Sequence, residues 1–398
     1  MAKVVVGLSG GVDSSVAAYL LKEQGHEVIG MFMINWHDTA GTLSGDCPWN
    51  DDLIFAELVA RKLEIPFHTI DFSEQYRQRV VDYMFDEYQR GRTPNPDVLC
   101  NREVKFDLFA DAASELGADF IATGHYCRKE TIEMDGKIIH RLLAGTDPSK
   151  EQSYFLCQVS QQQLAKALFP IGHLYKSEIR RIATRLELPT AEKKDSQGIC
   201  FVGKVDLPTF LQQKLEAKKG ITIEISKNSE YNPVFNKPVL GKIYTESELK
   251  EFAKEVSYKP DMGFEAGTHN GAHFYTIGQR KGLNIGGRKE PLFVLATDTK
   301  TNTIYVGQGH DHPGLNRYGL FIPATDLHWI RPDLALAPNQ KCEMLVRIRY
   351  RQALQKACLY STESGLYILF EQAQRGMTPG QFAAWYMDEE MIGSGVID

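Results

Sequence analysis

The chain has 398 residues, of which 43% are hydrophobic and 24% charged, with a formal net charge of −6. This length predicts two or three domains, the composition argues against wholesale disorder, and the charge argues against a wholly basic nucleic-acid coat. The sequence starts without a signal-peptide pattern, has no run of about 18 apolar residues, and carries seven cysteines without a CxxC pair. We therefore expect a cytoplasmic protein that does not bind a membrane.

The first 125 residues alternate between strand-like and helix-like segments. Strands are expected at Lys3–Leu8, Glu27–Ile34, Pro66–Ile70 and Asp119–Thr123, and helices at Ser14–Gln24, Asp51–Leu63, Glu74–Arg90 and Glu103–Leu116. This alternation predicts an α/β fold with a doubly wound parallel sheet. The dipeptide Asp135-Gly136 predicts a β-hairpin over residues 131–143 that decorates the sheet. Helices at 161–168 and 176–186 then lead into a loop at 193–203.

The composition and periodicity of the sequence change beyond about residue 206. Residues 218–260 are rich in Lys, Glu, Asn, Ser and Pro, with helical periodicity only at 246–256, which indicates a small connecting domain. From about residue 291, short alternating segments separated by turn residues predict a small β-barrel. The predicted domains are therefore a catalytic domain at 1–207, a central connecting domain at 208–290 and a C-terminal β-barrel at 291–398.

A glycine-rich turn follows the first strand and opens directly into a helix: residues 7–15 read GLSGGVDSS. Glycines allow close backbone approach, the helix N-terminus adds a positive dipole end, and the serine hydroxyls add donors, so this loop is a candidate phosphate site. Asp13 would repel phosphate unless it held a cation, so we expect it to bind Mg²⁺. A helix cap without a ligand is the structural alternative.

Two better-known phosphate motifs are excluded, because no GK[ST] follows the glycines and the spacing is not GxGxxG. The pattern SGGxDS at residues 9–14 instead resembles the pyrophosphate loop of the ATP pyrophosphatase superfamily. Members of that superfamily cleave ATP between its α and β phosphates to adenylate an oxygen. The resemblance implies ATP as a substrate and leaves the adenylated group open.

Two cysteines lie in polar surroundings that could make them reactive. Cys100 is in a proline-bearing loop just before a predicted helix, and Cys200 is in a glycine-bearing loop. Thiolates are favoured at helix N-termini and near basic residues, which here are Arg102, Lys105, Lys193 and Lys194. One thiol can carry sulfur as a persulfide while the other attacks it. The remaining cysteines, for which structural roles are expected, are Cys47, Cys127, Cys157, Cys342 and Cys358.

Two stretches could supply local positive charge for contact with phosphates, despite the negative total. Residues 176–194 carry six basic residues against three glutamates, and residues 347–351 alternate like a strand with one basic face. A solvated charged face is the alternative for each stretch, because charge patterning is a weak signal.

Several further motifs appear in a specific order. They are NW at 35–36, PNPD at 94–97, CN at 100–101, ATGHY at 122–126, KEQSY at 150–154, GICF at 198–201, GQRKGL at 278–283, RYR at 349–351 and PGQ at 379–381. Together with the phosphate loop they resemble the bacterial tRNA-specific 2-thiouridylases, over nearly the whole chain. The departures are a longer polar segment at about 218–261 and Glu151, where the family pattern leads us to expect aspartate.

The resemblance implies that the C2 oxygen of the wobble uridine is adenylated and then replaced by sulfur, giving 2-thiouridine, AMP and pyrophosphate. Cys200 would accept sulfur as a persulfide, and Cys100 would free sulfide or close a Cys100–Cys200 disulfide. Asp97 and Asp13 complete the implied catalytic set. ATP would be bound by Gly7, Leu8, Ser9, Gly10, Gly11, Val12, Asp13 and Ser14, with Met33 and Gly124 flanking the adenosine.

The resemblance also implies two partners. One is tRNA, bound through the anticodon region of tRNAs with a wobble uridine; the other is a sulfur donor such as a cysteine desulfurase or a persulfide carrier protein. The target base would meet Asn95, Pro96 and Asp97, and the other tRNA contacts would be His125, Lys150, Glu151, Gln152, Arg349, Tyr350 and Gln381.

Three other hypotheses remain open. A ligase of the same superfamily would add nitrogen and would not require Cys100 or Cys200. A non-catalytic adenine-nucleotide or RNA-binding module would need neither these thiols nor Asp13. A thiolating enzyme could also use an iron–sulfur cluster held by Cys100, Cys200 and a third ligand, although the lack of a CxxC pair speaks against it.

Overall fold

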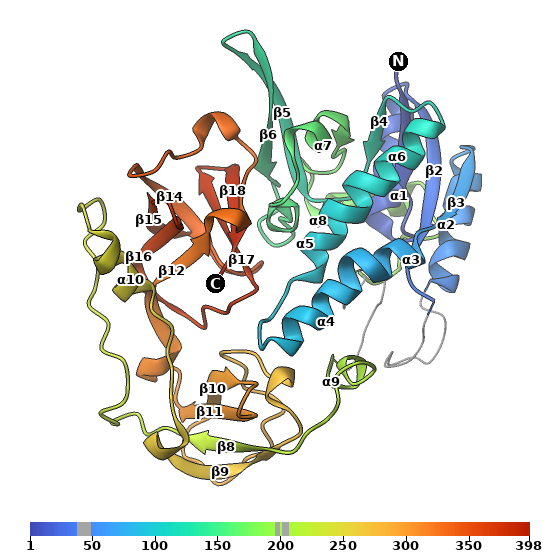
Figure 1. The fold of residues 1–398 in the computed structure, drawn as a ribbon. Helices are drawn as coiled ribbons and strands as arrows, with labels where there is room; N and C mark the ends of the chain where they lie inside the picture. Colours follow the sequence, from blue (N-terminus) through green and yellow to red (C-terminus); the bar gives the residue numbers. More distant parts are fainter. Residues whose placement is uncertain (38–48, 196–199, 201–206) are drawn as a thin grey trace.

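A computed structural model of the chain describes residues 1–37, 49–195, 200 and 207–398. Figure 1 shows three units: an N-terminal α/β domain, a small central β domain and a C-terminal β-barrel. Cys47 and most of the loop predicted at 193–203, including three residues of the GICF motif, lie outside the described residues.

The N-terminal sheet has five strands in the order β3-β2-β1-β4-β7. They are β1 (Lys3–Gly7), β2 (Glu27–Ile34), β3 (Phe67–Asp71), β4 (Phe120–Ala122) and β7 (Ala167–Leu168). All neighbours in this sheet pair in parallel, which confirms the predicted doubly wound parallel sheet. The chain builds outward from β1 first on one side and then on the other, so a crevice is expected at the carboxyl ends of β1 and β4.

Helices cover both faces of this sheet. They are α1 (Val12–Glu23), α2 (Asn50–Lys62), α3 (Ser73–Tyr76), α4 (Asp82–Gln89), α5 (Pro96–Cys100), α6 (Phe109–Glu115), α7 (Gln161–Lys166), α8 (Lys176–Arg185) and α9 (Leu207–Leu211). Successive side chains of a strand point to opposite faces. Val4 and Val6 accordingly enter the core that α1, α2 and α8 cover, whereas Val5 enters the core under α4, α5 and α6.

Two long helices on one face contain π-helical stretches. Arg77–Val81 joins α3 to α4, and Asn101–Leu108 joins α5 to α6. The second helix begins at Pro96, earlier than the predicted Glu103, because Asn95 caps it with a side-chain oxygen 3.4 Å from the Val98 nitrogen and proline suits the first helical position. Cys100 therefore lies inside a helix and not in the loop before it.

The central domain is a four-stranded sheet with the order β10-β11-β8-β9. Its strands are β8 (Gly220–Glu224), β9 (Phe264–His269), β10 (Leu292–Asp298) and β11 (Thr303–Gln308). Residues 291–308 were grouped with the C-terminal barrel in the sequence analysis, but β11 pairs in parallel with β8, about 80 residues earlier. Local alternation predicts a strand without naming its partner, which explains the difference.

The C-terminal sheet runs β12-β16-β15-β14-β17-β18-β6-β5, with β13 also paired to β18. Its strands are β12 (Asn316–Pro323), β13 (Leu327–Trp329), β14 (Lys341–Arg347), β15 (Gln355–Ser361), β16 (Gly365–Arg375), β17 (Phe382–Met387), β18 (Glu390–Val396), β5 (Cys127–Met134) and β6 (Lys137–Ala144). The predicted hairpin β5–β6 thus extends the barrel sheet and does not decorate the N-terminal sheet, because Leu143 pairs with Glu390. Helix α10 (Glu246–Ala253) comes from the polar segment, carries a capping box at Thr245, and packs on β12 and β16.

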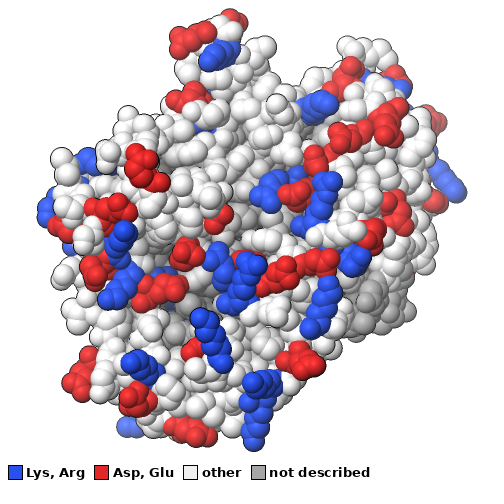
Figure 2. Space-filling view, viewed as in Figure 1, with Lys and Arg blue, Asp and Glu red and all other residues white. Residues whose placement is uncertain are grey.

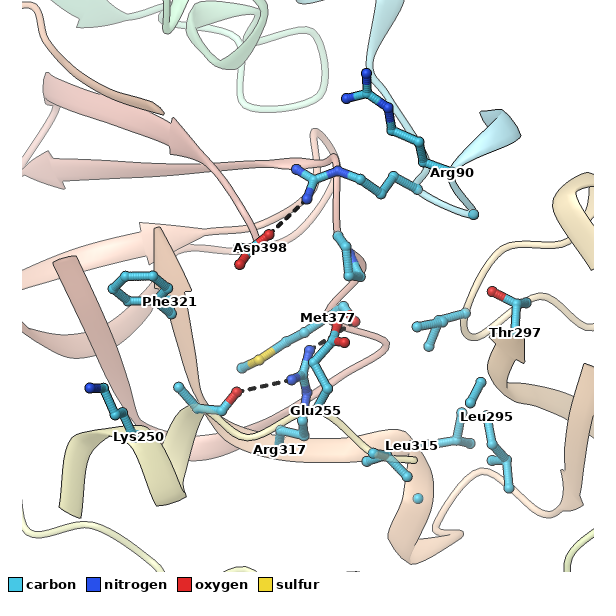
Figure 3. A pocket seen from close by; sticks show the side chains of 18 of the residues that line it. Arg90, Lys250, Glu255, Leu295, Thr297, Leu315, Arg317, Phe321, Met377 and Asp398 are labelled. Carbon is cyan, nitrogen blue, oxygen red and sulfur yellow. Dashed lines mark hydrogen bonds and ion pairs between the residues drawn. The ribbon is translucent and has the colours of Figure 1, made fainter. Parts of the chain in front are cut away.

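Single 3₁₀ turns complete the structure at Ser153–Leu156, Pro260–Met262, Ala272–Phe274, Pro313–Leu315, Ala324–Asp326 and Pro332–Leu334. A cavity of about 550 Å³ lies where the three units meet (Figure 3). Leu295 and Thr297 line it from β10, and Arg317 lines it from β12. Its lining includes none of the predicted site residues. Among the described residues, no helix is long and apolar enough to cross a bilayer.

Candidate active site

The predicted phosphate loop connects β1 to α1 at the carboxyl end of the middle strand. Gly10 has a φ of +72°, and a Cβ atom there would lie 2.2 Å from the backbone oxygen of Asp52. The hydroxyls of Ser14 and Ser15 donate to the Gly11 oxygen at 3.1 and 2.8 Å, and the Ser9 nitrogen donates to the Ser14 hydroxyl at 3.2 Å. Glycine-only geometry and serine hydroxyls therefore hold the loop at the positive end of the α1 dipole.

The two residues predicted to flank adenosine border this loop. Met33 is the next-to-last residue of β2, and a Cβ atom added at Gly7 would lie 3.4 Å from the Met33 Cε. Gly124 follows β4, and a Cβ atom there would lie 2.7 Å from the Ser14 nitrogen. Because β2 and β4 flank β1, the two residues approach the loop from both sides.

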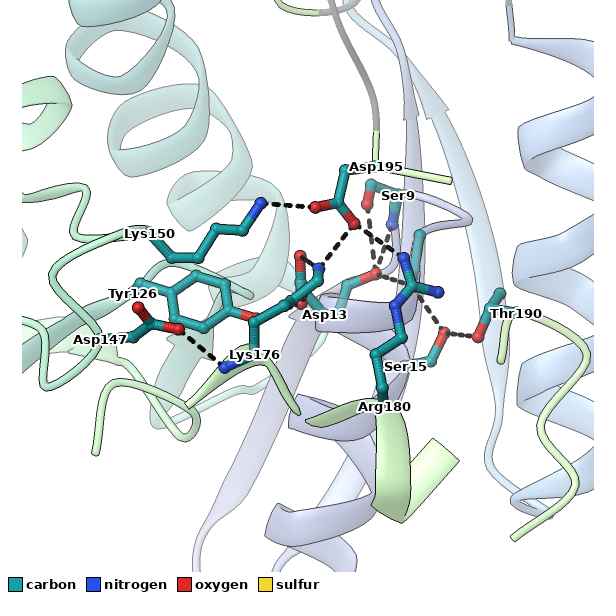
Figure 4. Close-up of polar contacts among 12 residues, drawn as sticks. Ser9, Asp13, Ser15, Tyr126, Asp147, Lys150, Lys176, Arg180, Thr190 and Asp195 are labelled. Carbon is teal, nitrogen blue, oxygen red and sulfur yellow. Dashed lines mark hydrogen bonds and ion pairs between the residues drawn. The ribbon is translucent and has the colours of Figure 1, made fainter. Parts of the chain in front are cut away.

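A cluster of charged side chains faces the loop from α8 and its surroundings (Figure 4). The Lys176 ammonium lies 2.8 Å from both carboxylate oxygens of Asp13 and 2.8 Å from Asp195. Asp195 also accepts from Lys150 at 2.7 Å and from Arg180 at 2.9 Å. Burial alone would raise the pKa of Asp195, but the hydrogen bonds from Lys150 and Lys176 lower it to about 2. Three cations thus surround one fully ionised carboxylate.

Asp13, the predicted magnesium ligand, is held by protein groups. Besides Lys176, the Tyr126 hydroxyl donates to it at 2.6 Å. No group of three or more His, Cys, Asp or Glu side chains that could hold a metal ion occurs within the described residues. A magnesium ion at Asp13 fits only where it replaces the Lys176 ammonium and phosphate oxygens supply further ligands.

The structure brings Cys100 and Cys200 together. Their sulfurs are 3.6 Å apart, with the Cys100 thiol as donor. Asp97 accepts the Cys200 backbone N–H at 2.9 Å, and the Tyr76 hydroxyl donates to the Cys200 oxygen at 2.7 Å. Lys105 lies close enough to both sulfurs to interact with them electrostatically. Among the described residues, no third side chain completes a group with this pair that could hold a metal ion.

The surroundings of the two thiols differ in their electrostatic effect. Burial raises the pKa of Cys100 well above its usual range. The hydrogen bond from Cys100 and the nearby Lys105 charge lower the pKa of Cys200 despite its burial. Burial would lower the pKa of Lys105, but the two sulfurs beside it raise it to about 12. Burial also raises the pKa of Asp97. Cys200 is thus the more easily ionised thiol.

The turn after β4 connects the two groups. Gly124 packs against the phosphate loop, and the Tyr126 hydroxyl bonds to Asp13. Between them, His125 is buried against Phe106 and accepts or donates a 2.7 Å hydrogen bond with Thr123. Burial and the nearby Lys105 lower the pKa of His125, so its ring is neutral at pH 7. One short segment of backbone therefore contacts the phosphate loop and also lies near Lys105, the lysine beside the thiol pair.

The residues predicted to contact tRNA lie at the junction of the α/β domain and the barrel. Glu151 is buried and forms an ion pair of 2.6 Å with Arg347, and Gln381 donates to the backbone oxygens of Thr93 and Pro94, just before Asn95. The Gln152 Oε1 accepts a hydrogen bond from the Tyr126 nitrogen, and Arg349 donates one to the Gly376 oxygen. The centres of the Tyr350 and Phe155 rings are 4.2 Å apart. Glu151, Tyr350 and Gln381 thus link the two domains, whereas Gln152 and Arg349 bond within their own domains. Contact of all these residues with tRNA stays a prediction.

Acidic and basic side chains are interspersed over the face shown in Figure 2. Basic side chains gather toward the middle of that face, between the barrel and the α/β domain. Of the two predicted basic stretches, residues 176–194 supply Lys176, Arg180 and Lys193 to ion pairs with Asp13, Asp195 and Asp52. These cations face carboxylates of the same domain and not a continuous basic surface.

Comparisons with known proteins cover the whole length. Three family models match successive parts of the chain. The model described as tRNA methyl transferase HUP domain matches residues 2–204, and the one described as tRNA methyl transferase PRC-barrel domain matches residues 249–308. The model described as Aminomethyltransferase beta-barrel domain matches residues 321–397. The chain is 58% identical to the tRNA-specific 2-thiouridylase MnmA of Flavobacterium johnsoniae, with both chains covered in full. The chain belongs to the tRNA-specific 2-thiouridylase family. Its identity is 57% to the Christiangramia forsetii relative, again over both full chains, and 47% to that of Karelsulcia muelleri, covering 99% of this chain and 98% of the relative.

This membership confirms the resemblance found from the motifs. The HUP domain is the α/β unit that carries the phosphate loop and both thiols. The PRC-barrel match includes β10 and β11, which agrees with their pairing in the central sheet. The family models name a methyl transferase, whereas all of these full-length relatives are named as thiouridylases.

Some residues of the site were not singled out from the sequence. The phosphate side depends on Lys176, Arg180 and Asp195, of which only the two basic residues had been noted, as part of a basic stretch. Tyr126 was noted only within the ATGHY motif and Lys105 only as one of four basic residues close to the cysteines. The position of Lys105, five residues after Cys100, was the available signal. Only the π-helical geometry of this helix places residues with that spacing near the same face.

Proposed function

We propose that this family member converts the wobble uridine of tRNA to 2-thiouridine in an ATP-dependent reaction, with Cys200 as the persulfide carrier. The observation that carries the residue assignment is the 3.6 Å separation of the Cys100 and Cys200 sulfurs, in the domain that also carries the phosphate loop. The family supplies the reaction class, and the geometry supports the proposed roles of the two cysteines.

ATP is proposed to bind at residues 7–14, with Met33 and Gly124 beside the adenosine. Backbone N–H groups of the loop and the α1 N-terminus suit an anionic triphosphate. Lys176 and Arg180 lie where they can add charge-assisted contacts to phosphate oxygens once they leave Asp195. Magnesium, bound between phosphate oxygens and Asp13, would neutralise part of the phosphate charge.

Adenylation makes the C2 oxygen a good leaving group. The oxygen attacks the α phosphate of ATP, pyrophosphate leaves, and a C2–O–AMP bond forms. A sulfur anion then adds at C2 and the oxygen leaves with AMP. In one route the sulfur is the outer atom of the Cys200 persulfide, and Cys100 afterwards attacks the Cys200 sulfur, so that the S–S electron pair stays on the tRNA sulfur. In the other route Cys100 attacks first and hydrosulfide is released.

Both routes end in a Cys100–Cys200 disulfide that an external thiol must reduce. The two sulfurs have to approach by only about 1.6 Å from their 3.6 Å separation to reach a normal S–S bond length. Cys100 lies inside a helix and is buried, so Cys200 is the thiol that an external persulfide donor can reach more readily. A cysteine desulfurase or a persulfide carrier protein fits this role.

The target uridine is proposed to leave the anticodon stack and meet Asn95, Pro96 and Asp97. These residues begin the helix that carries Cys100, so a base placed against them lies close to the thiol pair. Anticodon loops expose unstacked bases, which lowers the cost of this step. Gln381 holds the preceding backbone from the barrel side, so the barrel helps to position the base site.

The test is nucleoside mass spectrometry of unmodified tRNA incubated with the protein, ATP, Mg²⁺ and a persulfide source. Wild type should gain 2-thiouridine, whereas Cys100→Ser and Cys200→Ser should not. Cys342→Ser removes a partly exposed thiol of the barrel and should keep activity. Absence of 2-thiouridine in wild type, or a nitrogen-bearing product, would refute the reaction; activity in Cys200→Ser would refute the persulfide assignment alone.

A further inference from the structure

Lys105 lies on the same side of its helix as Cys100, for a geometric reason. The two residues are five apart, a spacing that an α-helix places on different faces. Residues 101–108 are π-helical, and the wider turn of a π-helix, with its i→i+5 hydrogen bonds, places residues five apart closer to the same face than an α-helix does. The wider turn therefore directs the Lys105 ammonium toward the thiol pair.

An ammonium at this partly buried position needs an anionic partner, because removing a cation from water costs several kcal/mol unless it is paired. The Cys200 sulfur and the Asp97 carboxylate are both near enough to Lys105 to interact with it electrostatically. Asp97 also accepts the backbone N–H of Cys200, which fixes this cysteine beside the lysine.

We propose that Lys105 is the cation that keeps the Cys200 sulfur anionic and so makes Cys200, and not Cys100, the thiol that takes up sulfur. The inference rests on the proposed persulfide role of Cys200. In that step the Cys200 thiolate attacks the outer sulfur of the donor persulfide, the donor S–S bond breaks, and its electron pair leaves on the donor thiolate. The resulting Cys200 persulfide anion stays paired with the same ammonium.

The other titratable groups around the pair do not supply this charge. They are Tyr76 from α3, Asp97 and Cys100 from α5, and His125 from the turn after β4. The shifts of Tyr76 and Cys100 keep both protonated and neutral, and His125 is neutral as well. Asp97 is acidic and opposes ionisation of the sulfur. Lys105 is thus the cation in this described set.

The experiment measures the alkylation rate of Cys200 by iodoacetamide against pH, with the labelled Cys100 and Cys200 peptides quantified separately by mass spectrometry. Lys105→Met should raise the apparent pKa of Cys200 by about one unit or more, which slows alkylation at pH 7 about tenfold. Lys105→Arg keeps the charge and should stay close to wild type. The matched control is Lys129→Met. Lys129 is another partly buried lysine, lies in strand β5 of the hairpin and donates to the Leu164 oxygen.

An unchanged pH profile in Lys105→Met, or an equal shift in Lys129→Met, overturns the proposal. So does a Lys105→Arg profile that matches the methionine variant, because the charge would then not be the cause. If Lys105→Met does not fold by circular dichroism, Lys105→Gln gives the same comparison. The assay needs no tRNA, ATP or sulfur donor, so a Lys105-dependent pKa combined with thiolation by Cys200→Ser would refute the persulfide role and leave the lysine's effect intact.

Discussion

Replacing Asp195 by asparagine is expected to tighten the binding of ATP. Asp195 is an internal anion that accepts from Lys150, Lys176 and Arg180 at 2.7 to 2.9 Å, beside the phosphate loop. A triphosphate in the loop would compete with this carboxylate for the same three cations. Asparagine keeps the size of the side chain and removes the charge, so the cations become available without that competition.

The magnitude follows from the exposure of the group. About a third of the Asp195 side chain is exposed, so each of its ion pairs is worth about 0.2–1 kcal/mol and not the larger value of a buried pair. Loss of three such pairs changes the competition by about 1–2 kcal/mol. The Kd for ATP should therefore fall roughly 5- to 30-fold.

Isothermal titration calorimetry with ATP and Mg²⁺ at constant ionic strength measures this difference. Glu192→Gln is the matched control, since it removes one exposed negative charge three residues away. Its Kd should move much less than that of Asp195→Asn. Weaker or unchanged binding in Asp195→Asn, or the same gain in Glu192→Gln, would show that Asp195 orients the cations for phosphate and does not compete with it.

Three further results are expected. Glu151→Gln leaves the buried Arg347 without its carboxylate partner and should lower the free energy of unfolding by about 3–5 kcal/mol in urea titrations. The double variant Glu151→Gln/Arg347→Met should recover much of this loss. Additive losses in the two single variants would contradict the coupling. Gly124→Ala forces a Cβ to 2.7 Å from a loop nitrogen and should weaken ATP binding in calorimetry, whereas Gly286→Ala has open space and should not. Because the pKa of Asp195 is lowered to about 2, its stabilising effect is complete above about pH 4 and is lost as the pH falls toward 2. Acid titrations should show that loss in wild type and not in Asp195→Asn.

Local signals were enough to predict the parallel sheet and the phosphate loop. Strand-like and helix-like segments alternated at the expected lengths, and the glycine-serine turn came directly between a strand and a helix. The missed helix start at Pro96 also had a local signal, because Asn95 followed by proline is a typical cap. The segment was read as a loop since polar residues and prolines favour loops when no cap is considered.

Strand partners were not accessible in the same way. The hairpin at 127–144 was predicted from its turn, but its pairing with β18 depends on residues about 250 positions later. The same applies to β11, whose partner β8 lies within the polar segment. Period-2 alternation reports which face of a strand is buried and contains no information about the strand beside it. The domain boundary near residue 290 was therefore placed ahead of two strands that belong to the central sheet.

The contacts that connect the phosphate loop with the surroundings of the thiol pair could not be predicted from the sequence either. The motif at 122–126 was visible in the sequence, yet its physical use emerges only when three neighbouring residues are followed to their contacts. Gly124 touches the phosphate loop, His125 lies beside Lys105, and Tyr126 bonds to Asp13. This segment continues from the buried strand β4, so it links the proposed place of adenylation to the lysine beside the proposed place of sulfur transfer. An adenylated uridine has a good leaving group that water can also displace, so the proposed mechanism requires the sulfur to be held close to the adenylated base, where its attack outpaces hydrolysis.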